Sequence, residues 1–396
     1  MNILFITLAW PVSGESNLYS ELVQEFSDNG HKPSVITIYN NKKSFLTKEG
    51  DIDILHVGSS AIQKTNKYLK VIRSFLLGPK ILINVRKFFS TNSFDLIVFA
   101  TPPITISPSV VFLKKRFNAK LYLLLKDIWP HDAVDLNEVR KGGIIWYVFR
   151  YLEKMTYRNS DYLGCMSPAN VEYILQNNDY IQKNKIEVCP NSLRLTKSTN
   201  NDVEQVRLKY DLPKNKTIFI YGGNIGKAQG IEFLIDIISY YKNDTRSFFL
   251  IIGSGTHFNY LLHELDGFHN TRVLRGLPRN EYDKILKACD VGLILLHPNS
   301  TVPNFPSRML SYLIAEKPII AAVDKATDIG EIIEKSGCGF HLLNGDMIGF
   351  NNVYEKIIIS KETRIKMGKN GYELFENKYT TNHSYSIIMN HFEDKL

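Results

Sequence analysis

The sequence lacks several features that mark common classes of protein. It holds no uncharged apolar stretch long enough to span a bilayer as a helix. The apolar start MNILFITLAWP has no basic flank before it and no small-residue cleavage site after it, so we expect a first strand and not a signal peptide. The four cysteines form no C-x-x-C pair, which argues against a disulfide framework or a zinc site. Buried thiols in a reducing compartment are predicted at Cys165, Cys189, Cys289 and Cys338.

Motifs for metals and nucleic acids are also missing. The sequence has one D-x-D pair, Asp51-Ile52-Asp53, and no cluster of histidine with carboxylates, and we expect no metal and no cofactor. Asp132, Asp135 and Glu138 are loosely spaced after a proline and are predicted to be surface residues. There is no nucleic-acid fold signature and no aromatic cluster of the RNP type, so we expect no nucleic-acid partner.

Acidic residues are scarce over one long stretch of this basic chain. Between Ile54 and Lys120 the only acid is Asp95, and the net charge of the whole chain is +8. A helix within this stretch would be basic on one side and apolar on the other, as helices on membrane surfaces are. A solvated helix face of a soluble protein is the alternative interpretation. The basic residues concerned are Lys64, Lys67, Lys70 and Arg73, and the apolar ones are Leu69, Ile72, Phe75 and Leu76.

What the sequence does have is a regular alternation of strand and helix. Apolar runs such as NILFITL, FDLIVFA and KLYLLL alternate with helical patterns such as 16–29, 142–159 and 168–178, which predicts parallel sheets covered by helices. The polar run TKSTNNDVEQ is predicted to be a linker. We expect an α/β protein with two doubly wound, Rossmann-like domains that face a central cleft. The predicted bounds are 1–195, 196–375, and a C-terminal helix, 376–396, that returns to the first domain.

One glycine-rich stretch, FIYGGNIGKAQGIEFL at 219–234, gives the first indication of a ligand. An apolar strand ends at Gly222, further glycines follow, and helical spacing begins at Ile231. The bare amides at a helix N-terminus suit an anion. This is not a Walker loop, because Ala228 stands where the magnesium-binding hydroxyl would be, and the glycines do not follow G-x-G-x-x-G. A plain turn between strand and helix is the alternative interpretation.

Further glycines and one arginine belong to the same predicted sheet. Gly253 and Gly255 follow a second strand-like run and Gly276 follows a third, so in a parallel sheet these loops share one edge. Such a group of loops suggests one extended ligand that carries phosphates and flat rings. Further along, Ser307 is expected to cap a helix whose first turn holds Arg308. A cation there opposes the helix dipole, which is reasonable if an anion lies beside it, although a plain exposed arginine is the alternative.

A series of motifs covers residues 216–340 almost without a gap: YGGNIGKAQGIEFL, LIIGSG, VLRGLPRNEYDKIL, ACDVGLILL, FPSRMLSYLIAEKPIIAA and GEIIEKSGCGF. MNILFIT, KDIWP and VCPNS occur in the first part of the chain. In this order the pieces resemble glycosyltransferase family 4, which has the GT-B fold. GNIGKAQG, DIWP and NFPSR are most similar to bacterial transferases of O-antigen and capsule synthesis, the N-acetyl-L-fucosamine transferases among them.

The chain departs from this family's pattern in its second half. Members often carry two glutamates before the G-K-P motif, but the aligned positions here hold no carboxylate, and Ser311 replaces the one that usually binds the nucleotide ribose. Asn224 and Gln229 stand where an arginine and a lysine often occur in the glycine loop. Lys227 and Arg308 are left as the nearby cations that would neutralise a diphosphate and take part in catalysis.

The resemblance implies a retaining transfer of a sugar, an N-acetylated hexosamine, from a UDP-sugar to a glycan on a polyprenyl diphosphate in surface polysaccharide synthesis. Lys126 replaces a histidine that often precedes the aspartate of DIWP, so Asp127 becomes the stronger catalytic candidate, with a turn cap as its alternative role. The implied donor-binding residues are Gly223, Asn224, Gly253, Gly255, Arg275, Gly276, Leu277, Ser307 and Ser311. Gly14, Glu15, Ser16 and Asn17 would meet the acceptor or the donor sugar.

Two other hypotheses remain open at this point. A UDP-sugar 2-epimerase of the same fold would need paired acids and a histidine in the cleft, and the sequence offers no such cluster. A nucleotide-sugar-binding module without activity is the other, because the paired glutamates are missing. A transferase with a lipid-linked acceptor is expected in the cytoplasm, peripheral on the anionic inner face of the plasma membrane, with the stretch from Lys64 to Phe89 facing the lipid.

Overall fold

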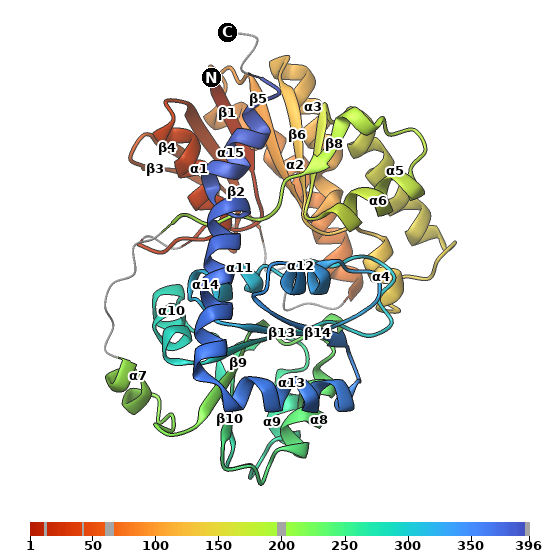
Figure 1. Cartoon of the computed structure of the whole chain (residues 1–396). Coiled ribbons are helices and arrows are strands. Elements are labelled where there is room, and N and C mark those ends of the chain that lie inside the picture. Colours follow the sequence, from red (N-terminus) through yellow and green to blue (C-terminus); the bar gives the residue numbers. More distant parts are fainter. Residues whose placement is uncertain (12–13, 42, 60–66, 196–202, 393–396) are drawn as a thin grey trace. The chain divides into compact units, whose positions relative to one another are not determined.

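The chain forms two compact units in the computed structural model, which describes residues 1–11, 14–41, 43–59, 67–195 and 203–392, with only the backbone described at 67–72. Unit 1 comprises Met1–Arg194 and Thr381–Leu396, and unit 2 comprises Leu195–Thr380. Each unit is a sheet of mainly parallel strands with helices packed against it (Figure 1). The sequence-based boundaries were placed after residues 195 and 375.

Unit 1 is built on an eight-stranded sheet in the order β3-β4-β2-β1-β5-β6-β7-β8. Neighbouring strands are parallel except for the antiparallel β3–β4 pair at one edge. The apolar runs form the central strands, and β5 and β6 are buried almost throughout because helices cover the sheet. The strands are β1 Asn2–Ile6, β2 Lys32–Tyr39, β3 Phe45–Glu49, β4 Ile52–Gly58, β5 Leu96–Thr101, β6 Lys120–Leu125, β7 Tyr162–Cys165 and β8 Ile186–Val188.

The helices of unit 1 include those predicted at 16–29, 142–159 and 168–178, which correspond to α1, α5 and α6. Asn17 caps the N-terminus of α1, because its side chain accepts hydrogen bonds from the amides of Tyr19 and Ser20. The bounds are α1 Leu18–Asp28, α2 Lys67–Phe88, η1 Ile104–Ile106, α3 Ser107–Phe117, α4 His131–Asp135, α5 Ile144–Asn159, α6 Pro168–Asn177, η2 Lys183–Lys185 and α15 Thr381–Met389.

Helix α2 covers the stretch predicted to be basic on one side and apolar on the other. Leu77, Ile81 and Val85 are fully buried and belong to the core, whereas Phe75 and Leu76 are exposed. Lys64 and the side chains up to Ile72 lie outside the described residues, so the predicted basic face is described only from Arg73 onward. The helix therefore packs into unit 1 along most of its length and presents apolar surface near residues 75–76.

The C-terminal helix α15 belongs to unit 1. The Thr381 hydroxyl donates to Glu25 Oε2 over 2.6 Å, and the ring of Tyr385 lies edge-on to Phe26 of α1 with centroids 4.9 Å apart. Ile388 and Met389 are buried in the same core as β1 and β2. The last turn of the chain thus completes the apolar core of the N-terminal unit.

Unit 2 has a six-stranded parallel sheet in the order β11-β10-β9-β12-β13-β14. The predicted linker TKSTNNDVEQ extends too far, because helix α7 begins within it, at Val203. The strands of unit 2 are β9 Thr217–Asn224, β10 Ser247–Ser254, β11 Thr271–Arg275, β12 Val291–Leu295, β13 Ile319–Val323 and β14 Gly339–Leu343. Its helices are α7 Val203–Lys209, η3 Lys227–Gln229, α8 Ile231–Tyr240, α9 Phe258–Glu264, α10 Arg279–Ala288, α11 Arg308–Ile314, α12 Ile329–Lys335, α13 Met347–Ile359 and α14 Lys361–Lys378.

Three general properties of the described chain bear on function. All four cysteine thiols are buried, as predicted. In the described part of the chain, no helix has the length and apolar character that a membrane crossing requires. The same residues contain no group of three or more His, Cys, Asp or Glu side chains arranged to hold a metal ion.

Candidate functional site

The predicted glycine loops of unit 2 lie together at one edge of the sheet. The register of β9 and β10 pairs Gly223 with Gly253 and Asn224 with Ser254, and Gly253 is paired with Arg275 on β11. Because these strands are parallel, their carboxyl ends all reach the same edge. The prediction that the loops share one edge is confirmed.

Two of these glycines are required by the packing of the loops on one another. A Cβ atom on Gly253 would lie 2.0 Å from the carbonyl oxygen of Gly223, and one on Gly255 would lie 2.3 Å from that of Ile225. A Cβ on Gly276 would meet nothing nearer than Ser254 Oγ at 4.0 Å. Gly253 and Gly255 therefore set the shape of the edge, while Gly276 stands in open space.

The end of β9 faces solvent at Gly223 and Asn224. Gly223 has φ +114°, a conformation that favours glycine, and both residues are exposed. The Tyr221 hydroxyl donates to the carbonyl oxygen of Asn224 over 2.8 Å and holds this corner in place. Lys227 lies exposed at the start of η3, and Gly230 leads from η3 into α8. The backbone at Gly223 and Asn224 is therefore held by the Tyr221 hydrogen bond and is exposed to solvent.

Arg308, the first residue of α11, lies beside this loop. Its Cζ atom is 4.3 Å from the centroid of the Tyr221 ring and 3.9 Å from the position that a Cβ on Gly223 would take. Nη2 donates a hydrogen bond to Gln229 Oε1. Nη1 is buried and has no hydrogen-bond partner in the part of the chain that the structure describes. Gln229 thus anchors the guanidinium next to the glycine loop, a role that the sequence did not indicate.

The surroundings of Arg308 are aromatic and neutral. Its electrostatic neighbours are the hydroxyls of Tyr221, Tyr312 and Tyr282, and no described carboxylate forms an ion pair with it. Burial raises the pKa of Tyr312 to about 12, so this hydroxyl stays neutral. The Tyr312 hydroxyl also accepts a hydrogen bond from the amide of Gly222 over 3.1 Å, which ties α11 to the end of β9. A fixed cation that has no carboxylate partner among the described residues, beside the exposed residues Gly223 and Asn224, is suited to an anion.

The remaining donor-site predictions have mixed outcomes in the structure. Ser307 has helical φ and ψ of −62° and −15° and its side chain does not cap α11, so its predicted capping role is wrong. Ser311 is half-buried one turn after Arg308, on the same side of α11. Arg275 is exposed, with its guanidinium 4.6 Å from the centroid of the Phe258 ring, and Leu277 is half-buried.

In unit 1, Asp127 follows directly after β6, at the carboxyl edge of that sheet. Its side chain is exposed but protein crowds it on most sides, and this loss of solvation raises the pKa of its carboxyl to about 6, against the opposing effect of Lys126. Asp127 is also near enough to Tyr19 to raise the pKa of that phenol, which burial chiefly sets at about 12. The start of α1 and the end of β6 therefore meet at this edge.

Lys126 is held inward beside the cysteines. Its Nζ atom donates to the carbonyl oxygen of Cys189 over 3.5 Å. Burial lowers the pKa of Lys126 to about 8, while the thiols of Cys189 and Cys165 and the carboxylate of Asp127 act in the opposite sense. The side chains of Lys126 and Asp127 thus differ in direction, one toward the interior and one toward solvent.

The residues predicted to meet the acceptor or the donor sugar lie before α1. Gly14 has φ +87° and is exposed, as is Glu15. The Ser16 hydroxyl donates to Glu21 Oε1 over 2.7 Å, and the Asn17 side chain is taken up by the helix cap. In this structure, Ser16 and Asn17 have local structural roles, and Gly14 and Glu15 present the open surface.

The three carboxylates predicted to be surface residues differ in how far they are exposed to solvent. Asp132 is partly buried and its Oδ2 accepts from the amide of Ile128 over 3.2 Å, so the surface prediction is wrong for it. Asp135 is half-buried as well, and Glu138 is exposed. A carboxylate directly after a turn can satisfy backbone amides of that turn, which the spacing alone did not indicate.

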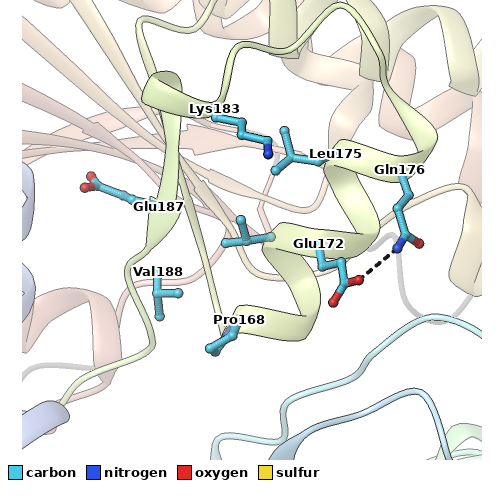
Figure 2. A pocket seen from close by; sticks show the side chains of 8 residues that line it. Pro168, Glu172, Leu175, Gln176, Lys183, Glu187 and Val188 are labelled. Atoms are coloured by element: carbon cyan, nitrogen blue, oxygen red, sulfur yellow. Dashed lines mark hydrogen bonds between the residues drawn. The ribbon is translucent and has the colours of Figure 1, made fainter.

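A separate hollow of about 570 Å³ lies on unit 1 between α6 and β8 (Figure 2). Gln176 donates to Glu172 Oε1 over 3.0 Å at its rim, and Glu187 is engaged by Tyr122 and His391. The hollow contains none of the predicted site residues. It is lined by Pro168, Val171, Glu172, Leu175, Gln176, Lys183, Glu187 and Val188.

Two curated bacterial proteins are similar to the chain in sequence. The probable glycosyltransferase WbjE of Pseudomonas aeruginosa is 25% identical over 298 residues, which cover 73% of this chain and 70% of WbjE. The putative colanic acid biosynthesis glycosyl transferase WcaI of Escherichia coli (strain K12) is 24% identical over 249 residues, 61% of this chain and 60% of WcaI.

Solved structures and a family model give the fold and the class. Sucrose-phosphate synthase from Thermosynechococcus elongatus superposes with a TM-score of 0.77 at 15% identity, over 99% of this chain and 98% of that one. Anabaena HepE, solved with UDP and glucose, has a TM-score of 0.73 at 14% identity over 100% of both chains. The family model for glycosyl transferases group 1 matches residues 202–374. Together, this match and the two relatives indicate the class of enzyme, and the chain is a glycosyltransferase with the GT-B fold of two Rossmann-like domains.

Proposed function

We propose that this enzyme transfers a sugar, an N-acetylated hexosamine, from a UDP-sugar to a glycan carried on a polyprenyl diphosphate, with retention of anomeric configuration. The product would be part of a surface polysaccharide. The observation that carries the proposal is the placement of Arg308, an arginine without a carboxylate partner among the described residues, next to the exposed corner at Gly223 and Asn224. The colanic acid role in the name of WcaI and the UDP bound by HepE support the choice of acceptor and donor.

In this proposal the glycine loop holds the donor diphosphate. When the bond between sugar and diphosphate breaks, negative charge grows on the leaving phosphate, and fixed donors at that point lower the barrier. Arg308 supplies a cation whose position is set by Gln229 and Tyr221. Lys227 supplies a second, exposed cation on the same loop. We assign Gly223, Asn224 and Ser311 to the donor side as well.

Asp127 is proposed to act on the acceptor side. It lies at the carboxyl edge of the unit 1 sheet, where ligands of open α/β sheets bind. A carboxyl with a pKa of about 6 is ionised at neutral pH, so it can accept a hydrogen bond from the acceptor hydroxyl or stabilise positive charge on the sugar ring. Gly14 and Glu15, which are exposed before α1, are assigned to contact with the acceptor or the donor sugar.

The enzyme is proposed to work as a peripheral protein on the inner face of the plasma membrane. A polyprenyl-linked acceptor is confined to the bilayer, so the enzyme has to reach the lipid surface to bind it. The described part of α2 agrees with this in part, because Phe75 and Leu76 are exposed. Leu77, Ile81 and Val85 of the same helix are in the core of unit 1, and Ile83 is 67% exposed.

A single assay tests this function. Purified protein is incubated with a panel of UDP-sugars and a detergent-solubilised polyprenyl-diphosphate glycan, and the donor and acceptor are then analysed by mass spectrometry. We expect an increase in acceptor mass by one sugar and release of UDP. Isomerisation of the donor alone would indicate a 2-epimerase, and donor binding without either reaction would indicate a binding module.

A further inference from the structure

Helix α5 is apolar on both of its sides. Phe149 and Leu152 are buried, 4% and 5% exposed, and pack with Ile104 in a small core. On the opposite side Ile144 is 86% exposed and Tyr151 is 67% exposed. A helix on the surface of a globular protein normally carries polar residues on its outer side. The outer side of α5 therefore lacks a partner in this chain, among the residues that the structure describes.

The exposed apolar side chains of α5 form one stripe along the helix. They recur at the three- and four-residue steps that place side chains on one face, and all are more than two fifths exposed. We call this the α5 stripe. Its members are Ile144, Tyr147, Val148 and Tyr151, with Ile145 beside them.

Helix α2 adds exposed apolar side chains near α5. The ring of Phe75 lies 5.9 Å, centroid to centroid, from the ring of Phe149, which is on the buried side of α5. Phe75 and its neighbour Leu76 are 36% and 52% exposed. Helices α2 and α5 both pack against η1, so the two helices lie close to each other in unit 1. The apolar surface therefore comes from two segments that are far apart in the sequence.

The exposed charges on α5 and on the two residues Arg140 and Lys141 before it are positive, and the nearest exposed acid before them in the chain is Glu138. Arg140 and Lys141 are exposed just before the helix, and Lys154 and Arg158 are exposed farther along it. The one acid within α5, Glu153, is buried and paired with Arg150. An anionic surface would thus meet exposed cations before and along α5 and no exposed carboxylate on the helix itself.

We propose that the α5 stripe, with Phe75 and Leu76, is the surface by which unit 1 docks on an anionic lipid bilayer. Tyrosine rings with apolar bodies and polar tips are favoured at the membrane interface. An apolar stripe with flanking cations has the composition of helices that lie in the interface plane. The proposal rests on the lipid-linked acceptor proposed above, and it names a surface that the sequence had placed on α2 alone.

Vesicle co-sedimentation of the full chain tests this directly. Wild-type protein is expected to bind vesicles of phosphatidylcholine with phosphatidylglycerol, to bind pure phosphatidylcholine more weakly, and to lose binding as salt is added. The variant Ile144→Ser/Tyr147→Ser/Tyr151→Ser removes the apolar part, and Arg140→Glu/Lys141→Glu reverses two flanking charges. Each should lower partitioning onto anionic vesicles by about tenfold or more.

Matched controls separate the stripe from general surface effects. Ile348→Ser/Ile359→Ser removes two apolar side chains of unit 2 that are 78% and 76% exposed, and Lys366→Glu/Lys369→Glu reverses two exposed cations of α14. Both control variants should bind vesicles as the wild type does. Thermal melting and UDP binding should be unchanged in all four variants, since all the substituted side chains are exposed and none is assigned to the proposed site.

Several results would overturn the proposal. Wild-type protein that ignores anionic vesicles, or stripe variants that bind them unchanged, would show that lipid does not cover α5. Concentration-dependent dimers by analytical ultracentrifugation that vanish in the Ile144→Ser/Tyr147→Ser/Tyr151→Ser variant would assign the stripe to a second copy instead. Failure of the proposed transferase function is seen separately, because transfer to the detergent-solubilised acceptor does not need vesicle binding.

Discussion

The guanidinium of Arg308 lies over the ring of Tyr221, with Cζ 4.3 Å from the ring centroid. The two residues come from different elements, the start of α11 and the end of β9, and Gln229 of the loop between β9 and α8 accepts a hydrogen bond from the same guanidinium. A cation on an aromatic face and in a hydrogen bond is restricted in position before any ligand arrives. This preorganisation is what electrostatic stabilisation of a leaving diphosphate requires.

Replacing Arg308 by alanine is expected to cripple turnover and leave the fold intact. The loss of a charge-assisted contact to the leaving group should raise the barrier by about 2–4 kcal/mol, which is about thirty- to a thousandfold in kcat. Arg308→Lys keeps the charge but loses the planar fork and the stacking, so it should restore only part of the rate. Steady-state kinetics with circular dichroism as a fold control provide the measurement. A rate near that of the wild type in Arg308→Ala would remove Arg308 from the site.

Gln229 is expected to act through Arg308. Gln229→Ala should lower kcat by about tenfold, because a hydrogen bond to a charged group is worth about 1.5–3 kcal/mol. Gln229→Glu should be as slow as Arg308→Ala, since a carboxylate at this position would pair with the cation. In the double variant Arg308→Ala/Gln229→Ala, the second change should add almost nothing to the first, as residues that act as one unit are not additive. Additive effects of the two changes would mean that Gln229 has an independent role.

The glycines of the loop edge allow a matched pair of substitutions. Gly253→Ala places a Cβ 2.0 Å from the Gly223 carbonyl oxygen, so the β9 corner must shift, and we expect a loss of about 1–3 kcal/mol in the free energy of unfolding together with weaker UDP binding. Gly276→Ala enters open space and should change stability by less than about 0.5 kcal/mol. Chemical denaturation and calorimetric titration with UDP measure both effects. Equal stability of the two variants would contradict the close approach of β9 and β10.

The order of strands and helices was predictable because buried parallel strands are apolar runs, as at β5 and β6, and helices between them are amphipathic. The edge at which the glycine loops meet follows from parallel pairing alone. The contacts of Arg308 do not, because Gln229 is 79 residues away in the chain and Tyr312 meets Gly222 across 90 residues. Only the packed fold brings such pairs together.

For α5 the sequence predicted the helix but not which of its sides is buried. The range 142–159 was identified as a helix, but a helix with apolar residues on both sides does not reveal from its sequence which side is buried. Ser307 illustrates the same point for a single residue, since serine before a helix usually caps it, whereas here the residue itself has helical backbone angles. In both cases the outcome depends on neighbours that are distant in the sequence.

Asp127→Asn provides a test with opposite effects on rate and stability. The folded protein holds the Asp127 proton with a pKa of about 6, above the ordinary value of 3.8, because the carboxylate has lost solvation. Between these pH values the folded state binds more protons than the unfolded chain, so stability falls as pH rises through this window and stays lowered above it. Asparagine removes this cost, and Asp127→Asn should melt at a higher temperature than the wild type at neutral pH.

The rate of the same variant should fall. If the ionised carboxylate acts on the acceptor or on the sugar ring, wild-type kcat should decrease below about pH 6, and Asp127→Asn should be slow at every pH without that step. UDP affinity, measured by calorimetry, should change little, because the residue belongs to unit 1 and the proposed donor site to unit 2. Asp179→Asn, an exposed aspartate of unit 1, serves as the control and should leave rate, melting temperature and pH profile unchanged. A parallel fall in UDP affinity and rate would make Asp127 a donor ligand, and a lower melting temperature would make it a structural cap of the turn.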